Sequence, residues 1–406
     1  MKKELTINLG YLLYGEEFDL KQSCNITIDV EEGKIVSIGN SWRGNALEFK
    51  WAIAIPSLVN AHIHTADYAF QEAGLNLTLG EIVSEPHGLK HRLLSKISED
   101  KIKKAIRKVL INLISQGVHL VIDFREGGVK GLKLALEAAK NLPITYIPLG
   151  RPTKKPLEVE ELNELRKYSK GVGLSTPIMY TNKELEIMQK IFSNHIIATH
   201  VAENPKCHEL NDYWIAIKKL KANIIVHGIH LNDREIKDLS NRNTLLVLCP
   251  RSNLWFSSGI PPVHKFIEND IKLALGTDNA GWISPNIWRE LETTWNIIKL
   301  IKPRFDKAKV LLSMVTLNPI KTLNKLSYIR GNGVLKEGEN ANITFMSMNE
   351  LDLEYSHNKI ASIIKRCDRE VIKVVMYNGL IAKITRSLLK EPKINSLLHS
   401  HVILSG

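Results

Sequence analysis

The feature that most constrains the fold is a regular alternation of short apolar runs with longer amphipathic stretches between residues 51 and 329. Alternation of this kind is typical of βα units, in which helices cover a parallel sheet. Eight apolar runs can be counted, at Ala52–Val59, His119–Phe124, Ile144–Leu149, Gly171–Ser175, Ile196–His200, Asn223–His227, Thr244–Cys249 and Ile271–Thr277. Eight such units predict an α/β fold, a (β/α)8 TIM barrel over residues 51–329.

The two ends of the chain have a different pattern, in which short β-prone segments are separated by turns. Residues 1–50 show this pattern, and residues 330–386 include Asn378-Gly379, a strong signal for a β-hairpin. We expect both ends to pack together as one discontinuous β-sandwich domain beside the barrel. Residues 387–406 are expected to form a loosely ordered tail.

Composition excludes several classes of function. The formal charge of +12 favours encounters with anions, but no zinc-finger spacing or aromatic-plus-basic cluster accompanies it. We therefore attribute the charge to lysines on solvated helix faces and predict no nucleic-acid partner. The N-terminus is too polar for a signal peptide, and no apolar run approaches the ~18 residues of a membrane span. Four widely spaced cysteines suit reduced thiols, so we expect a cytoplasmic protein without a membrane partner.

Metal-capable side chains recur where the predicted strands end. His62 and His64 are one residue apart at the end of the first strand, so both imidazoles face the same side. His200 ends the fifth strand, His227 and His230 lie at the end of the sixth, and Asp278 follows the eighth. Taken singly, each could be an ordinary loop or core residue, and Asp278 could cap a helix. Because the carboxyl ends of barrel strands converge on one mouth, the set together predicts a site for Zn²⁺ or Fe²⁺.

These residues belong to a larger set of motifs that spans most of the chain: His62-x-His64, His200 with Glu203 three residues later, His227 with His230, Cys249-Pro-Arg-Ser-Asn253 and Gly276-Thr-Asp278. The set resembles the amidohydrolase superfamily. It is most similar to the branch that contains S-adenosylhomocysteine and methylthioadenosine deaminases, guanine and cytosine deaminases, and triazine chlorohydrolases. The resemblance implies the barrel and the terminal β domain already expected.

The resemblance also implies a single divalent metal ion, which we expect to be Zn²⁺, with Fe²⁺ as the alternative. Its implied ligands are His62, His64, His200 and Asp278. Binuclear relatives use a carboxylated lysine at the end of the fourth strand, where this chain has Gly171-Val-Gly-Leu-Ser-Thr-Pro177 and no lysine. This departure indicates the mononuclear type.

The implied reaction is hydrolytic deamination of a nitrogen heterocycle by metal-activated hydroxide. Asp278 would accept a proton from the water as general base, and Glu203, if protonated, would donate one to a ring nitrogen. His227 would stabilise charge that develops on oxygen. Glu203 could instead be an ordinary helix-start carboxylate. Two other readings remain open, namely hydrolysis of an amide or carbon–halogen bond, and a scaffold without turnover.

Four further residues are candidates for contact with a small-molecule substrate: Arg125, Arg151, His87 and Trp282. Two arginines at strand ends would suit an anionic group on the substrate, since guanidinium binds carboxylates and phosphates in bidentate fashion. Internal ion pairs with Asp123 or Glu126 are the competing interpretation. His87 lies in a segment that is either a lid or a basic surface stretch, and Trp282 would stack on a ring or fill core.

The chain departs from the nucleoside deaminases at two places in the expected pocket. Thr65-Ala-Asp67 follows His64, and Asn279-Ala-Gly-Trp282 follows Asp278, and neither matches the adenosine-type pattern. These differences leave the metal ligands intact but put adenosine-derived substrates in doubt. A homo-oligomer is compatible with the sequence, which holds no feature that decides the oligomeric state.

Overall fold

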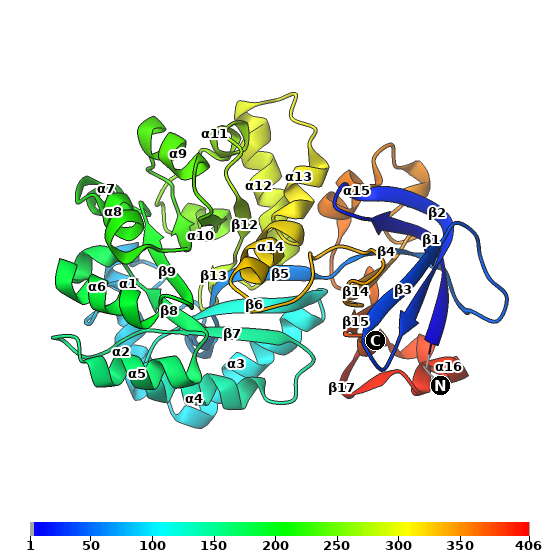
Figure 1. Ribbon diagram of the computed structural model, residues 1–406, viewed down its shortest axis with the longest axis horizontal. Coiled ribbons are helices and arrows are strands. Elements are labelled where there is room, and N and C mark those ends of the chain that lie inside the picture. Colours follow the sequence, from blue (N-terminus) through cyan, green and yellow to red (C-terminus); the bar gives the residue numbers. More distant parts are fainter. Residues whose placement is uncertain (1–3, 406) are drawn as a thin grey trace.

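The structure is a computed structural model that describes residues 4–405, and Figure 1 shows that its two sheets lie side by side. The larger sheet is parallel, with the order β12-β11-β10-β9-β8-β7-β6-β5-β13. Its strands are β5 (Leu58–His64), β6 (Val118–Arg125), β7 (Thr145–Gly150), β8 (Gly171–Leu174), β9 (Ile196–Val201), β10 (Ile224–His227), β11 (Leu245–Leu248), β12 (Leu273–Leu275) and β13 (Asp278–Asn279). β12 and β13 are two parts of the eighth strand.

The barrel is closed by pairing between its first and last strands. Asp278 in β13 lies opposite Ile63 in β5, and Asn279 lies opposite His64. A glycine at position 276 makes this approach feasible, because a Cβ there would lie 2.6 Å from the Cβ of His62. The predicted (β/α)8 barrel is therefore confirmed.

Helices surround the barrel strands, and most begin at a polar N-cap. In α3, for example, Ser98 accepts a hydrogen bond from the Lys101 amide, and apolar side chains at helical spacing face the sheet. The longer helices are α3 (Glu99–Ile114), α4 (Gly128–Ala139), α5 (Val159–Tyr168), α6 (Asn182–Ile191), α9 (Asp233–Ser240), α12 (Ile287–Ile301), α14 (Leu317–Lys325) and α15 (Lys359–Arg366).

Shorter helical segments occupy the connections. They are η1 (Thr65–Phe70), α1 (Leu79–Val83), α2 (Leu89–Lys96), η2 (Pro177–Met179), α7 (Pro205–Glu209), α8 (Asp212–Ile215), η3 (Ala216–Leu220), α10 (Pro250–Trp255), α11 (Val263–Glu268), α13 (Ala308–Ser313), η4 (Leu353–Tyr355), η5 (Arg386–Lys390) and α16 (Pro392–Asn395). None of the helices within residues 4–405 is both long and apolar enough to cross a membrane.

Both chain ends contribute to the second sheet, whose order is β17-β16-β15-β14-β4-β1-β2-β3. Its strands are β1 (Glu4–Tyr14), β2 (Asp19–Asp29), β3 (Lys34–Gly39), β4 (Leu47–Pro56), β14 (Ile343–Ser347), β15 (Ile372–Tyr377), β16 (Leu380–Thr385) and β17 (Leu398–Ser405). Phe49 and Phe345 meet edge to face in its core, with ring centroids 5.3 Å apart. The two ends thus share one apolar core, as expected for a discontinuous domain.

Two sequence expectations differ from the structure at the borders of this domain. The apolar run Ala52–Val59 is divided, because β4 ends at Pro56 and β5 begins at Leu58 in the other sheet. Ser57 donates its amide to Asn342 of the terminal domain, whereas Leu58 donates to Gly117 of the barrel. The segment expected as a loose tail is also ordered, since β17 pairs with β16 and Ile394 is fully buried.

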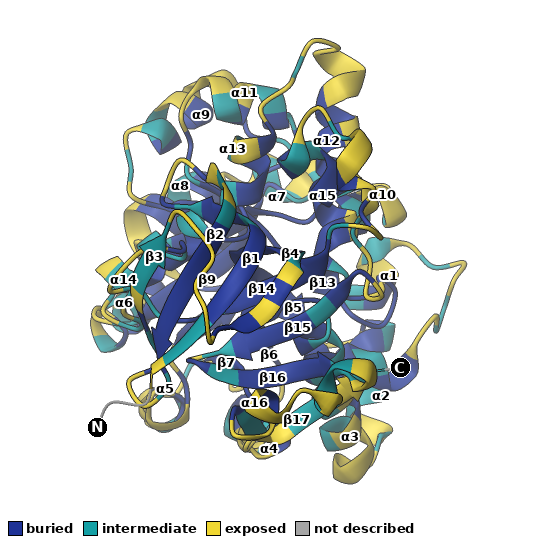
Figure 2. Ribbon diagram, turned by 90° about the vertical axis from the view of Figure 1, so that its right-hand side faces the viewer, coloured by how far each residue is buried: buried dark blue, intermediate teal, exposed yellow. Residues whose placement is uncertain are grey.

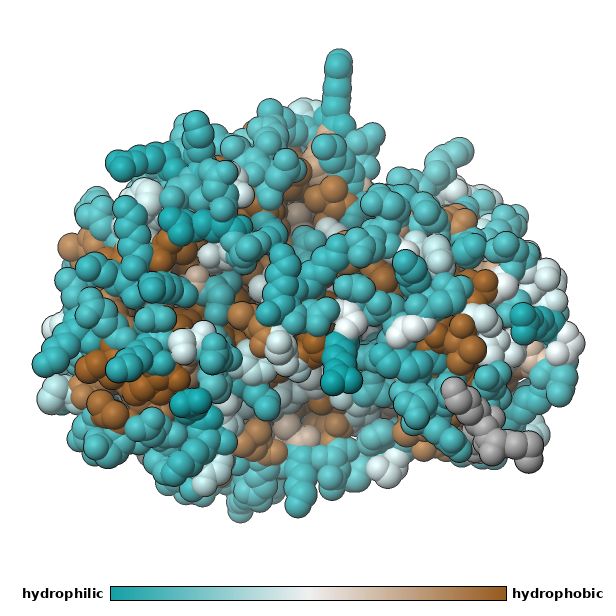
Figure 3. All heavy atoms as spheres, viewed as in Figure 1, coloured by the Kyte–Doolittle hydropathy of each residue, from teal (hydrophilic) through white to brown (hydrophobic). Residues whose placement is uncertain are grey.

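Burial is concentrated in the two sheets. In Figure 2 the strands are largely dark blue, while the surrounding helices carry yellow, exposed segments. Figure 3 shows a mostly hydrophilic face with smaller apolar areas between charged side chains. This arrangement leaves the carboxyl ends of the barrel strands as the place where buried polar side chains gather.

Candidate functional site

Four metal-capable side chains meet at the carboxyl end of the barrel. His62 and His64 come from β5, His200 from β9 and Asp278 from β13, and all four are buried. One ligand atom of each lies within 4.8 Å of the others. The structure therefore brings together the three imidazoles and the carboxylate that the strand ends suggested.

The distances within this cluster suit one metal ion. Nε2 of His62 lies 3.1 Å, and Nε2 of His64 lies 3.5 Å, from Oδ1 of Asp278. Two ligand atoms of a tetrahedral ion with bonds of about 2.0–2.1 Å are separated by roughly 3.3 Å. Three nitrogen donors and one carboxylate oxygen are also a donor set that Zn²⁺ and Fe²⁺ accept. The residues present thus fit a divalent metal ion.

Neighbouring groups orient the ligand side chains. Nδ1 of His200 donates to the carbonyl oxygen of Leu174 at 2.9 Å, which leaves Nε2 for a metal. Oδ2 of Asp278 accepts hydrogen bonds from Ser252 at 2.5 Å and from Asn279 at 3.1 Å, so Oδ1 faces the histidines. Such partners fix the ring and carboxylate orientations before an ion binds.

The electrostatic environment keeps these groups in the protonation states that metal ligation requires. Burial lowers the pKa of His64 to about 3 and also lowers the pKa of His62 and His200. Burial opposes ionisation of Asp278, but its hydrogen bond with His62 and the nearby imidazoles hold the pKa well below its usual value. Neutral imidazoles and an ionised carboxylate are the metal-binding forms.

A second group of titratable residues adjoins the first. Oε1 of Glu203 lies 3.5 Å from Nε2 of His227, and both belong with Asp278 to a metal-capable group. Burial raises the pKa of Glu203, and this effect outweighs that of His227, which lowers the same pKa. The side-chain amide of Asn253 donates to Nδ1 of His227 at 2.9 Å, so Nε2 carries the proton and points to Glu203.

Backbone strain marks two of these positions. His227 has φ 77° and Asp278 has φ 57°, in the left-handed region that residues with a Cβ rarely adopt. Each such conformation costs on the order of 1–3 kcal/mol and persists only where the surroundings enforce it. The strain turns both side chains toward the same space at the barrel mouth.

That space is a narrow cavity of about 40 Å³, lined by both titratable groups and by charged residues from the loops. Arg151 lines it, as predicted, but its Nη1 atom lies 2.7 Å from Glu85 and 3.5 Å from Glu126. Arg125 lies outside the cavity lining and pairs with Glu126 at 2.5 Å and with Asp123 at 3.4 Å. Both arginines thus make the internal ion pairs that were the competing interpretation.

The other two candidates for substrate contact lie away from the cavity. His87 is exposed in the loop before α2. Trp282 packs against Phe70 and Phe256, and its Nε1 atom donates to the carbonyl oxygen of Ala73 at 2.8 Å. These contacts assign Trp282 to an apolar cluster, which was one of its two predicted roles.

Sequence reasoning missed Lys90, which lies in a segment that was interpreted mainly as basic surface. Its side chain is 3% exposed, lines the cavity and contacts Asp67 at 2.8 Å and Glu126 at 2.7 Å. No local pattern could have revealed this, since its two partners lie elsewhere in the chain, after β5 and at the end of β6. Ser252 and Asn253 were also missed as orienting residues, although their motif had been singled out.

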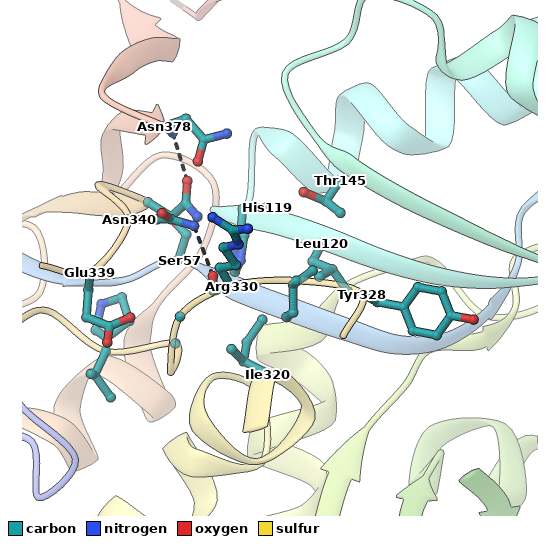
Figure 4. A pocket seen from close by; sticks show the side chains of 16 residues that line it. Ser57, His119, Leu120, Thr145, Ile320, Tyr328, Arg330, Glu339, Asn340 and Asn378 are labelled. Carbon is teal, nitrogen blue, oxygen red and sulfur yellow. Dashed lines mark hydrogen bonds between the residues drawn. The ribbon is translucent and has the colours of Figure 1, made fainter. Parts of the chain in front are cut away.

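A larger cavity of about 210 Å³ lies at the opposite end of the barrel, against the terminal sheet (Figure 4). Ser57, His119, Arg330 and Asn340 are among the residues that line it. Within residues 4–405, both metal-capable groups lie at the other end of the barrel. The smaller cavity is therefore the candidate active site, despite its size.

Comparison with known proteins supports this assignment. Residues 53–382 match the amidohydrolase family. The chain belongs to the amidohydrolase family. The match covers the whole barrel and both metal-capable groups, so amidohydrolase chemistry at this site, hydrolysis of a carbon–nitrogen bond, follows from the family and the geometry together.

Individual relatives share the family fold over most of their length. An uncharacterized protein of Methanocaldococcus jannaschii is 35% identical over 375 residues, which are 88% of this chain and 94% of that protein. A 5-methylthioadenosine/S-adenosylhomocysteine deaminase of Pyrococcus furiosus is 25% identical over 380 residues, 85% of this chain and 86% of its own. A zinc-bound adenosine deaminase of Xanthomonas campestris superposes with a TM-score of 0.79 at 17% identity, over 98% and 94% of the two chains.

Proposed function

We propose that this amidohydrolase removes an amino group from a nitrogen heterocycle as ammonia, using one divalent metal ion, Zn²⁺ in the first instance. The observation that carries this proposal is the placement of Glu203 and His227 next to the cluster of His62, His64, His200 and Asp278. A hydrolytic deaminase needs a water-activating site and a proton donor within reach of the same substrate ring.

The metal would be held by His62, His64, His200 and Asp278. When bound, a divalent ion lowers the pKa of a coordinated water toward neutrality. Fe²⁺ suits the same donor set, and the absence of a lysine among Gly171–Pro177 favours a single ion over a pair.

The chain's own residues would handle the protons. Asp278, held ionised, accepts a proton from the attacking water. Glu203, whose raised pKa favours the protonated form, donates to the ring nitrogen beside the carbon that water attacks. His227 presents its Nε2 proton to the oxygen that becomes negatively charged during addition. Collapse of the adduct then releases ammonia and leaves a carbonyl group.

The relatives support deamination but do not identify the substrate of this chain. The Pyrococcus furiosus relative is named as a methylthioadenosine and adenosylhomocysteine deaminase, but it shares only 25% identity with this chain. The departures from the nucleoside deaminases after His64 and Asp278 favour a compact ring over an adenosine derivative with a large 5′ substituent.

The test is metal analysis of the purified protein followed by ammonia release from a panel of purines, pyrimidines and pterins. We expect about one Zn²⁺ or Fe²⁺ per chain and ammonia from at least one compact ring. A metal-free protein without turnover would contradict the proposal and favour a scaffold. Turnover of an amide or halide without ammonia from any heterocycle would replace deamination with the alternative hydrolysis.

A further inference from the structure

A buried carboxylate at the end of β6 contacts one of the metal-capable histidines. Oε1 of Glu126 lies 2.7 Å from Nδ1 of His64. The same oxygen lies 2.7 Å from the ammonium group of Lys90 and 3.5 Å from Nη1 of Arg151. The other oxygen, Oε2, accepts from Nη2 of Arg125 at 2.5 Å. Glu126 is only 6% exposed, so nearly all of its charge is balanced by these neighbours.

Burial of an ionised carboxylate such as that of Glu126 costs free energy unless an opposite charge pairs with it. Removing a carboxylate from water costs several kcal/mol, and good geometry with opposite charges is needed to offset that cost. Three cations around Glu126 offset this penalty, although one ion pair with Arg125 would already neutralise the group. Each of these cations also pairs with a second carboxylate, Lys90 with Asp67, Arg125 with Asp123 and Arg151 with Glu85. The contact of Glu126 with Nδ1 of His64 is therefore the feature that the balance of charges does not explain.

His62, His64 and His200 differ in the partner of Nδ1, the ring nitrogen on the side away from the proposed metal ion. Nδ1 of His200 donates to a neutral carbonyl oxygen. Among the described residues, neither Nδ1 of His62 nor Nδ1 of His64 forms a hydrogen bond of regular geometry. His64 alone of these three has a carboxylate at Nδ1, while its Nε2 atom lies toward Asp278 at 3.5 Å.

We propose that Glu126 is a positioning residue for metal binding, which accepts the Nδ1 proton of His64 and so leaves Nε2 unprotonated and aimed at the metal. Lys90 completes the arrangement from α2, which covers the cavity, and ties that helix to the metal site through Glu126 and Asp67. A carboxylate at the outer nitrogen of a ligating histidine fixes its tautomer and raises its basicity. This inference rests on the proposed metal site and adds a residue to it.

The alternative is that Glu126 belongs to an ion cluster that only stabilises the fold. Glu85 provides a matched control, because it pairs with Arg151 at 2.7 Å in the same cluster but has no contact with a metal-capable histidine among its ion pairs. A purely structural role predicts similar effects for Glu85→Gln and Glu126→Gln. A positioning role predicts that only Glu126→Gln alters metal affinity.

The experiment measures Zn²⁺ affinity of the full chain by competition with a chromophoric chelator, with circular dichroism as the test of folding. We expect Glu126→Gln to weaken Zn²⁺ binding about 10–100-fold, the effect typical of losing such a partner. Glu85→Gln should stay within about twofold of the wild type. Glu126→Asp, which keeps the charge but withdraws the oxygen from Nδ1, should also weaken binding and decides the matter if Glu126→Gln does not fold.

Two results would overturn the inference. Wild-type Zn²⁺ affinity in folded Glu126→Gln or Glu126→Asp, or equal losses in Glu85→Gln and Glu126→Gln, would show that Glu126 acts only on the fold. Failure of the wild-type protein to bind Zn²⁺, Fe²⁺ or Co²⁺ at all would instead overturn the proposed function itself. The two failures are therefore distinguishable.

Discussion

Nε2 of His62 lies 3.1 Å from Oδ1 of Asp278, although 216 positions separate them along the chain. The contact depends on barrel closure, since β13 pairs with β5 beside these side chains. A metal ion held here would tie the first, fifth and eighth strands together. Such an ion would couple the activity of the protein to the stability of its fold.

Metal binding should stabilise the fold through Asp278. At an ion concentration about 1,000-fold above Kd, a ligand specific for the folded state adds about 4 kcal/mol to the free energy of unfolding. We expect Zn²⁺ to raise the Tm of the wild type, and a chelator to abolish both this rise and turnover. Asp278→Asn should lose the Zn²⁺-dependent rise in differential scanning calorimetry. His264→Ala, a histidine outside the site, should retain it.

Glu203 should act in catalysis without holding the metal. Glu203→Gln removes the proton donor, and loss of a general acid typically lowers the rate about 10²–10⁴-fold. Metal content should remain at the wild-type level, because the proposed ligands His62, His64, His200 and Asp278 are intact. Steady-state kinetics and metal analysis check this result. The matched variant is Glu209→Gln, an exposed glutamate nearby, and a similar loss there would argue against a specific role for Glu203.

Asn253 should control which nitrogen of His227 carries the proton. Asn253→Ala removes the donor to Nδ1, and we expect kcat to fall on the order of 10²-fold, by analogy with loss of one oxyanion-stabilising donor. Asn253→Asp conserves size but places an acceptor at Nδ1, so a neutral His227 ring carries its proton on Nδ1 and none on Nε2. Its kcat should fall at least as far as that of Asn253→Ala. Wild-type kcat in Asn253→Asp would contradict this assignment.

Glu290 should make the stability of the metal-free protein depend on pH. Burial raises the pKa of Glu290 from 4.5 to about 8, despite its partner Arg251 at 3.3 Å. Between these values the folded state binds more protons than the unfolded state, so stability falls as pH rises. We expect a decrease on the order of 1–4 kcal/mol from pH 5 to pH 8.

Urea denaturation of the chelator-treated protein at several pH values measures this slope. Glu290→Gln should reduce the slope between pH 5 and pH 8, and burial of Asp67 and Asp212, which raises their pKa values to about 7 and about 6, accounts for part of the remainder. The surface variant Glu292→Gln should keep the wild-type slope. A slope that persists unchanged in Glu290→Gln would assign the pH dependence to other groups.

The C-terminal segment should contribute to the stability of the terminal domain. Ile394 is fully buried in that core, so Ile394→Ala should lower the free energy of unfolding by about 2–4 kcal/mol. Leu404 in β17 is 44% exposed, and Leu404→Ala should change the free energy of unfolding by about 0.5 kcal/mol or less. If chemical denaturation gave equally small changes for Ile394→Ala and Leu404→Ala, residues 387–406 would behave as the loosely ordered tail that the sequence predicted.

The sequence by itself determined the barrel and the cluster of potential metal ligands. Both follow from local patterns, because an apolar strand of known direction places its last polar residues at a known edge of the sheet. His62 and His64 share a face for that reason, and His200 and Asp278 follow the same rule. Spacing alone could therefore place a set of metal-capable side chains at one end of the barrel, and the family resemblance selected four of them as ligands.

Tertiary structure alone decided the features that depend on distant partners. Lys90 looks like a surface lysine in sequence, and only the folded chain supplies Asp67 and Glu126 to balance its charge. The division of Ala52–Val59 at Ser57 likewise depends on hydrogen bonds to two different domains. Contacts between residues that are tens to hundreds of positions apart leave no periodicity in the sequence, so no pattern along the chain could have revealed them.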